Sequence, residues 1–274
     1  MNKSSFGSHF TVTTWGESHG KALGAVIDGC PAGLSLSEED IQKFLDRRKP
    51  GQSRYTTARK EGDLVEILSG VFEGKTTGTP ISLMVRNTDQ RSHDYGNIAY
   101  SYRPGHADYT FDAKYGFRDY RGGGRSSGRE TIGRVASGAV ASRLLASLGI
   151  SFCTYTKSIG PVSIKEFNPE EINNNAFYMP DADAAAKAGT YLEECMKNQD
   201  SAGGVIECRI SGVPAGLGNP VFEKLDAMLS QAVMSVGAVK AVEIGDGIQV
   251  AHMKGSEDND GFLIRDNVIT KTSN

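Results

Sequence analysis

Apolar residues recur at helical spacing in some stretches of the chain and form short runs bounded by glycine and proline in others. The first pattern is typical of amphipathic helices and predicts them over residues 38–48, 128–148, 181–198 and 220–236. The second is typical of strands and predicts them over residues 10–13, 22–27, 64–72, 81–85, 150–156, 160–164, 205–210 and 239–244. Residues 88–102 are polar and indicate a loop, and residues 255–274 hold no strong pattern.

Capping residues mark the ends of these helices. Ser37, with Asp40 three residues later, can cap helix 38–48, and Pro50-Gly51 should end that helix at Lys49. Ser127 and Glu130 have the spacing of a capping box, and Asn219 precedes a proline at the favoured first position of helix 220–236. We expect helix 38–48 to bury Ile41, Phe44 and Leu45. In helix 128–148 the expected buried residues are Ile132, Val135, Ala136, Ala139, Val140, Leu144 and Leu148. In helix 220–236 they are Phe222, Leu225, Met228, Leu229, Ala232 and Val233.

The chain also contains an internal repeat. Residues 17–34 correspond to residues 200–217 at a constant offset, and Val65-Glu66-Ile67 is echoed by Val242-Glu243-Ile244 after the next helix. Two matches in the same order predict a duplicated α/β unit, over about residues 10–150 and 200–274, whose sheets share or face a core. The second copy has fewer residues after its Val-Glu-Ile segment, so we expect one domain, 1–274, that lacks a C-terminal segment present in a longer parent.

Composition narrows the class of protein. The formal net charge of −3 argues against wholesale binding to nucleic acid, and no apolar run approaches membrane-spanning length. Spacings typical of a structural zinc site are missing, so no metal is predicted. The N-terminus has no secretory signal, and the four scattered cysteines favour reduced, mostly buried thiols in the cytosol.

Glycine and arginine are concentrated between Arg103 and Arg134. Gly122-Gly123-Gly124 allows a ligand to approach the backbone, and the following helix presents the positive end of its dipole. Five arginines add positive charge: Arg118, Arg121, Arg125, Arg129 and Arg134. We interpret this stretch as a phosphate site, the alternative being a surface loop with solvated arginines. The basic segment 43–60, with Arg48 and Arg54 beside a Pro-Gly turn, is either a second anion site or a solvated face.

Two histidines lie between glycines and are candidates for proton transfer near neutral pH. They are His19, in Gly16-Glu17-Ser18-His19-Gly20, and His106, in Pro104-Gly105-His106. The alternative is a hydrogen-bonded structural histidine in a turn. His19 aligns with Ala202 in the repeat, and a histidine serving only the fold would be expected in both copies, so the asymmetry favours function for His19. His9, His93 and His252 lack such surroundings.

Three motifs together closely resemble the chorismate synthase family: residues 16–20, 103–108 and 125–131. Residues 29–34, 74–80 and 242–247 match the same family, so the resemblance covers essentially the whole chain. It implies a β-α-β-α sandwich with an internal pseudo-two-fold, in a cytoplasmic homotetramer. It also implies that reduced FMN supports the anti-1,4-elimination of phosphate from 5-enolpyruvylshikimate 3-phosphate to give chorismate.

The resemblance assigns roles to individual residues. His19 would protonate the leaving phosphate, and His106 would stabilise the reduced flavin. Arg48 and Arg54 match positions that bind phosphorylated substrate or NADPH. The flavin-binding positions would be Arg125, Ser126, Ser127, Gly237 and Ala238.

The family pattern continues with a further flavin-binding segment and a catalytic aspartate that this sequence does not contain. Two alternatives from other classes therefore stay open. One is a non-catalytic module that binds phosphate or flavin, and the other is a flavin-dependent oxidoreductase.

Overall fold

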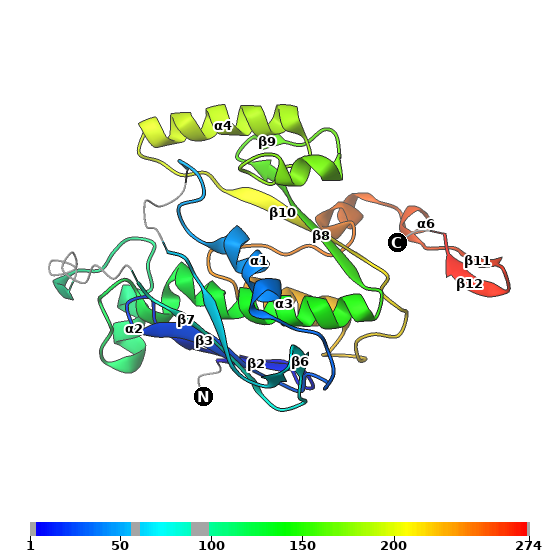
Figure 1. The fold of residues 1–274 in the computed structure, drawn as a ribbon. Helices are drawn as coiled ribbons and strands as arrows, with labels where there is room; N and C mark the ends of the chain where they lie inside the picture. The colour runs from blue at the N-terminus through cyan, green and yellow to red at the C-terminus, as the bar shows by residue number, and fades with distance from the viewer. Residues whose placement is uncertain (1–3, 56–60, 89–98, 273–274) are drawn as a thin grey trace. The chain divides into compact units, whose positions relative to one another are not determined.

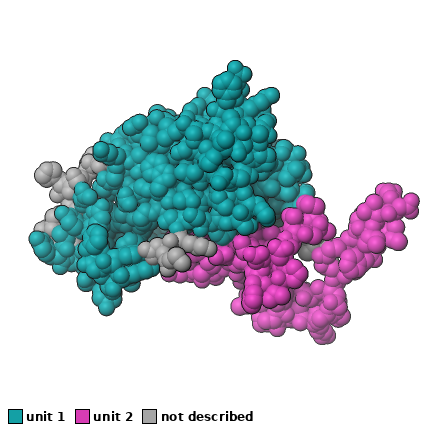
Figure 2. All heavy atoms as spheres, turned by 90° about the horizontal axis from the view of Figure 1, so that it is seen from below, with its two compact units in different colours: residues 1–213 teal, residues 214–274 magenta. Residues whose placement is uncertain are grey.

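The computed structural model describes residues 4–55, 61–88 and 99–272. The chain divides into two compact units, residues 1–213 and residues 214–274, which Figure 2 colours separately. Most of the expected loop 88–102, His93 and the end of the basic segment 43–60 lie outside the described residues.

A five-stranded antiparallel sheet forms the first layer of unit 1, in the order β1-β2-β3-β7-β4 (Figure 1). Its strands are β1 (Ser5–Phe6), β2 (Thr11–Gly16), β3 (Ala22–Asp28), β7 (Ile81–Arg86) and β4 (Val65–Ser69). Alternate residues are buried on the inner strands, including Leu23 and Ile27 on β3 and Leu83 on β7, so one face of the sheet carries the core. A short hairpin, β5 (Val71–Phe72) and β6 (Lys75–Thr76), follows β4.

Two helices cover this face, α1 (Glu38–Arg48) and α3 (Thr131–Ser147). The buried residues Ile41, Leu45, Ile132 and Val140 join the strand residues in one core cluster. Helix α3 lies so close to the sheet that a Cβ on Gly133 would come 2.8 Å from Gly24 O. Only glycine allows this approach, which fixes the N-terminal half of α3 against β2 and β3.

A second layer of unit 1 contains a three-stranded antiparallel sheet in the order β10-β8-β9, with β8 (Ser151–Ile159), β9 (Val162–Ser163) and β10 (Gly204–Ser211). Helix α4 (Ala182–Lys197) packs on it through Ala184, Ala185 and Ala188, beside the buried Met179. The short helix α2 (Asp108–Tyr115) precedes the glycine-rich loop.

Unit 2 contains α5 (Leu225–Met234), α6 (Gly255–Asp258) and a hairpin of β11 (Phe262–Arg265) and β12 (Val268–Lys271). The hairpin turns through Asp266 and Asn267, both at positive φ (50° and 63°), as a two-residue turn requires. None of the residues of α5 is buried.

Most predicted elements of unit 1 are confirmed. Helix 38–48 has the predicted bounds, Ser37 and Asp40 form a capping box, and the helix ends at Lys49. Phe44 was expected in the buried stripe and is instead 42% exposed. The predicted strands 10–13, 22–27, 64–72, 81–85, 150–156, 160–164 and 205–210 all overlap observed strands, as helix 181–198 overlaps α4.

The predicted capping box at Ser127 is wrong. Ser127 Oγ accepts a hydrogen bond from Arg129 N at 3.3 Å and caps a 3₁₀ turn, Gly128–Glu130, before α3 begins. The Glu130 carboxylate does not return to Ser127, because it accepts hydrogen bonds from Thr14 Oγ1 (2.8 Å) and Arg134 Nε (2.8 Å). In α3, Val135 and Leu144 are half-buried, and Leu148 is exposed.

The predictions for unit 2 also need correction. The helix starts at Leu225 rather than at 220, because Val221 has a positive φ of 72° and Asn219 N donates to Glu223 O in a turn. Its expected apolar face is not buried: Phe222 is 88% exposed, and Met228, Leu229 and Ala232 are half-buried. Residues 239–244 pair with no described strand; Gly247 N donates to Ile244 O in a turn. Residues 255–272 hold the hairpin that the sequence pattern did not indicate.

The cysteines are free, but only Cys30 among them is buried, so the expectation of mostly buried thiols is wrong. Burial raises the pKa of the Cys30 thiol, despite its hydrogen bond with Thr76.

Candidate active site

His19 lies in the turn between β2 and β3. Its neighbour Ser18 is 1% exposed, and Ser18 Oγ lies 3.1 Å from Gly122 O and 3.1 Å from His19 Nδ1. Because a carbonyl oxygen can only accept, the Ser18 hydroxyl donates to Gly122 O. Ser18 Oγ can then accept a hydrogen bond from His19 Nδ1–H. In this neutral tautomer Nε2 carries no proton.

The glycine-rich loop packs directly on the His19 ring. Gly122, Gly123 and Gly124 have φ of 68°, 85° and 54°, in the left-handed region that favours glycine. A Cβ on Gly122 would lie 2.0 Å from both Cε1 and Nδ1 of His19, and one on Gly124 would lie 3.8 Å from Glu17 Cγ. The loop and the His19 turn therefore form one continuous surface.

Asp119 is a second ionisable group near His19. Burial alone raises the pKa of Asp119, but hydrogen bonds from Arg121, with the charges of Arg121 and His19, outweigh this and hold it below its usual value.

The segment that contains His106 meets the same loop. A Cβ on Gly123 would lie 3.7 Å from Arg103 Nη2. Arg103 donates to both oxygens of Asp108, each at 2.9 Å, and these bonds hold the pKa of Asp108 well below its usual range, although burial opposes the shift. His106 lies between these two residues and is exposed, so it can face a ligand. The turn that contains His19 thus meets residues 103–124, which lie far from it in the sequence.

The predicted flavin-binding residues of this loop differ in what they contact. Arg125 donates to Gly16 O (3.0 Å) and to Thr14 Oγ1 (2.6 Å), so its guanidinium anchors the loop to the end of β2. Ser126 Oγ donates to Gly123 O (2.7 Å). Ser127 Oγ accepts from Arg129 N, and its own proton can be donated to an anion.

The five arginines of this stretch are paired with acidic residues, so their positive charge is partly compensated. Each has a carboxylate oxygen within 3.5 Å. The pairs are Arg118–Asp112, Arg121–Asp119, Arg125–Glu130, Arg129–Asp63 and Arg134–Glu130. An anion bound here would meet oriented backbone and hydroxyl donors together with arginines that already have partners.

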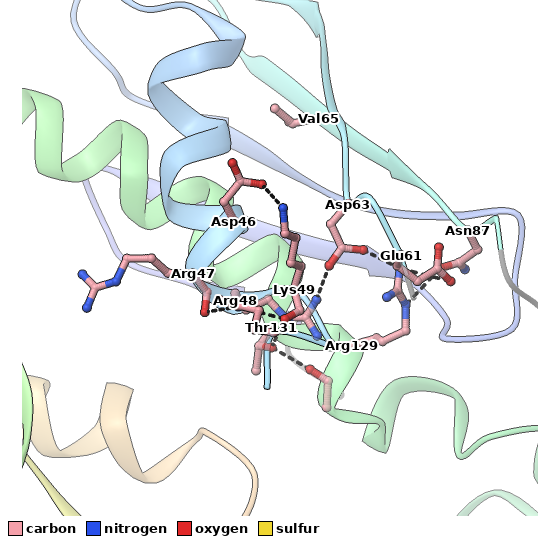
Figure 3. A network of polar contacts seen from close by, with 12 residues as sticks. Asp46, Arg47, Arg48, Lys49, Glu61, Asp63, Val65, Asn87, Arg129 and Thr131 are labelled. Carbon is pink, nitrogen blue, oxygen red and sulfur yellow. Dashed lines mark hydrogen bonds and ion pairs between the residues drawn. The ribbon is translucent and has the colours of Figure 1, made fainter. Parts of the chain in front are cut away.

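Arg48, at the end of α1, reaches the start of α3 (Figure 3). Its Nε donates to Thr131 Oγ1 (3.2 Å), and its Nη1 donates to Asp63 Oδ2 (2.6 Å). Asp63 also accepts a hydrogen bond from Arg129 Nη2 (3.0 Å). The Asp63 carboxylate therefore links Arg48 to Arg129, which follows the Ser127–Gly128 turn. The structure therefore brings Arg48 to the N-terminus of α3.

Arg54 is not placed there. It is 70% exposed and forms an ion pair with Glu193 of α4 and a hydrogen bond with Tyr55. Gly237 and Ala238 follow α5 in unit 2, where Ala238 adopts a positive φ of 70°. Both are exposed.

Sequence reasoning missed Asp63, Glu61 and Asn87, which surround Arg48 and Arg129. Glu61 and Asp63 have fully buried side chains, and Glu61 accepts from Thr88 Oγ1 (2.7 Å). Paired acidic residues directly after a basic segment were a usable signal for Glu61 and Asp63. Asn87, at the end of a strand, gave none.

The described residues contain no group of three or more histidine, cysteine, aspartate or glutamate side chains arranged to hold a metal ion. No helix among them has the length and apolar character needed to cross a bilayer.

Comparison with known proteins gives a consistent result. The family model for chorismate synthase matches residues 10–274. Chorismate synthase of Agathobacter rectalis is 65% identical over 276 residues, covering 100% of this chain and 75% of the relative. That of Lachnoclostridium phytofermentans is 66% identical over 264 residues, covering 96% and 72%.

A solved structure described as "Crystal Structure of Chorismate Synthase" superposes with a TM-score of 0.81 at 34% identity, covering 97% of this chain and 78% of that one. This likeness confirms the mixed α/β fold expected from the sequence. The chain spans about three quarters of the length of these relatives.

Proposed function

This chain belongs to the chorismate synthase family of lyases, and we propose that it eliminates phosphate from 5-enolpyruvylshikimate 3-phosphate at the site around His19. The product of this anti-1,4-elimination is chorismate. The observation that carries the assignment of the site is the meeting of the His19 turn, the Arg103–Asp108 segment and the glycine-rich loop.

His19 has the contacts of a proton donor to the leaving phosphate. Its Nδ1–H is directed to Ser18 Oγ, whose own proton is taken by Gly122 O. A protonated His19 can therefore release a proton from Nε2 and keep Nδ1–H bonded to the same acceptor. The neutral ring left behind is already in the tautomer that Ser18 accepts, so no side chain has to rotate after the transfer.

Arg48 is the arginine best placed to bind the phosphorylated substrate. Its guanidinium is fixed by Asp63 and Thr131, so little rotamer entropy is lost when it meets an anion. Arg54 would add a more mobile contact, since its side chain is 70% exposed. We assign both residues to the phosphorylated substrate or to NADPH.

The loop residues fit reduced FMN as cofactor. The hydroxyl proton of Ser127 is available for an anion, and the backbone around Gly105 and Gly128 is open, since a Cβ on either would meet nothing within 4 Å. Ser126 and Arg125 complete the proposed flavin contacts of this loop, and His106 would lie beside the flavin ring and stabilise its reduced form. When bound, reduced FMN would provide transient electron donation and a proton acceptor, with no net oxidation, while Ser127, Ser126 and Arg125 would hold it.

We further infer that the enzyme works as a cytoplasmic homotetramer. Membership of the family supports this inference, together with the sequence resemblance over essentially the whole chain. Gel filtration with light scattering tests the oligomeric state directly.

The activity itself is tested with purified protein, the substrate and dithionite-reduced FMN under anaerobic conditions. We expect chorismate and phosphate in equal amounts while the flavin stays reduced. Flavin oxidation coupled to substrate reduction would instead identify an oxidoreductase, and binding without product would identify a binding module. His19→Ala should abolish most of the product, whereas His252→Ala, at an exposed histidine of unit 2, should leave it unchanged.

A further inference from the structure

Asp63 and Asn87 lie outside the motifs that support the proposed function, yet their side chains join the residues that carry it. Asp63 is fully buried and has a left-handed φ of 45°, a conformation that glycine would adopt more easily. A glycine would lack the carboxylate, whose contacts are specific.

Each oxygen of Asp63 holds one arginine. Oδ2 accepts from Arg48 Nη1 at 2.6 Å, and Oδ1 accepts from Arg129 Nη2 at 3.0 Å (Figure 3). Glu61 Oε1 lies 4.0 Å from the same Arg129 nitrogen, so two carboxylates face two guanidinium groups. Asp63 thereby fixes the end of α1 to the turn that begins α3.

Asn87 continues the chain of contacts from Arg129 to the His19 turn. Its Oδ1 accepts from Arg129 Nε (3.1 Å), while its Nδ2 donates to Glu17 O (3.1 Å) and Gly20 O (2.8 Å). The two carbonyl oxygens can only accept and Arg129 Nε can only donate, so the orientation of the amide is determined. Asn87 thus closes the turn on both sides of His19.

We propose that Asp63 and Asn87 are positioning residues of the reaction, Asp63 acting through Arg48 and Asn87 acting through His19, with Arg129 joining them. This inference rests on the proposed function of Arg48 and His19. The connected contacts hold the phosphate-binding guanidinium and the proton-donating imidazole in a fixed relation, although the two lie on different elements.

A merely structural role would affect stability and leave no residue-specific signature. A positioning role predicts different signatures for the two residues. Asp63→Asn should weaken binding of 5-enolpyruvylshikimate 3-phosphate by about tenfold and add nothing in an Arg48→Ala background, because residues that act as a unit are not additive. Asn87→Ala should lower kcat by about tenfold with little change in KM.

A readout that does not depend on activity is the imidazole ¹⁵N spectrum, in which the His19 signals are identified with His19→Ala. We expect Asn87→Ala to shift or broaden the His19 signals and to leave those of His252 unchanged. Asn87→Asp keeps the acceptor for Arg129 but places an oxygen against Glu17 O and Gly20 O, so it should show the same His19 change. Arg86→Ala is the matched control, since Arg86 is the neighbouring residue and pairs only at the surface with Glu66.

Circular dichroism tests whether each variant is folded. If Asp63→Asn does not fold, Asp63→Glu takes its place, because it keeps the charge but displaces the carboxylate. The same loss of affinity is expected for that variant. The proposal is overturned by additive effects of Asp63 and Arg48, or by unchanged His19 signals in Asn87→Ala. If the wild-type chain forms no chorismate while the His19 signals still respond to Asn87→Ala, the proposed function fails and the positioning of His19 stands.

Discussion

Replacing Gly122 with alanine tests whether the glycine-rich loop sets the position of the His19 ring. Two effects add in this variant. The residue has a φ of 68°, so any L-residue there is strained, at a cost of about 1–2 kcal/mol. The new Cβ would also lie 2.0 Å from the His19 ring, where ordinary contact begins at 3.4 Å. The ring or the loop must therefore move by about 1.4 Å, and a misplacement of about 1 Å can reduce turnover by about 10²-fold.

The two effects can be separated with a matched variant. Gly116 ends α2 with a φ of 79°, and a Cβ there would meet nothing within 4 Å. Gly116→Ala should therefore lose stability through the backbone strain alone and keep its turnover.

Urea unfolding measures the strain in both variants, and chorismate formation with reduced FMN measures the displacement. We expect both variants to lose stability, Gly122→Ala more than Gly116→Ala because the clash adds to the strain, and a loss of turnover of about 10²-fold in Gly122→Ala alone. Equal turnover in the two variants would show that the loop does not position His19.

Three further predictions concern other parts of unit 1. His19→Ala and His106→Ala should each lower turnover by roughly 10²–10⁴-fold with little change in folding, while exposed His9→Ala should not; near-normal turnover in both would refute the assigned roles. Gly133→Ala should destabilise the protein by about 1–3 kcal/mol, because the new Cβ overpacks against Gly24 O. Gly138 is exposed in the same helix, so Gly138→Ala should stabilise the protein by about 0.5–1 kcal/mol by removing the cost of glycine in a helix. Urea unfolding measures both effects. Asp108→Asn should be less stable than wild type at neutral pH, because Arg103 depresses the pKa of Asp108 in the folded state. The difference in the free energy of unfolding between the two proteins should persist down to about pH 4 and shrink as the pH falls further toward the folded pKa. A constant difference down to pH 2 would contradict this reasoning.

Local signals predicted much of unit 1. Ser37, Asp40 and Pro50 bracket α1 by capping and by the missing proline N–H, effects that need no tertiary information. The motif around Ser127 was less informative, because Glu130 binds Thr14 on a distant strand instead of the helix start. A carboxylate with a distant partner cannot be recognised from spacing alone.

The candidate site shows the same division. Glycine brackets indicated His19 and His106, but the partners that orient His19, namely Gly122 O and Asn87, are brought together only by the fold. In unit 2 the periodicity of residues 220–236 predicted a buried face, whereas the backbone of Val221 prevents a helix there and no residue of α5 is buried. The Asp266-Asn267 pair was a readable hairpin signal that apolar periodicity alone did not reveal.

The pairing of the five arginines from Arg118 to Arg134 with carboxylates has a kinetic consequence. Paired charges produce a dipolar field, which declines with distance faster than that of a bare cation cluster, and physiological salt screens it further over about 8 Å. Such a stretch contributes little long-range attraction to an approaching dianion, so its part of the association rate should depend only weakly on ionic strength. Selectivity among anions at this stretch then depends on the dissociation rate. The substrate anion dissociates slowly once the arginines have replaced part of their contacts with the carboxylates by contacts with that anion.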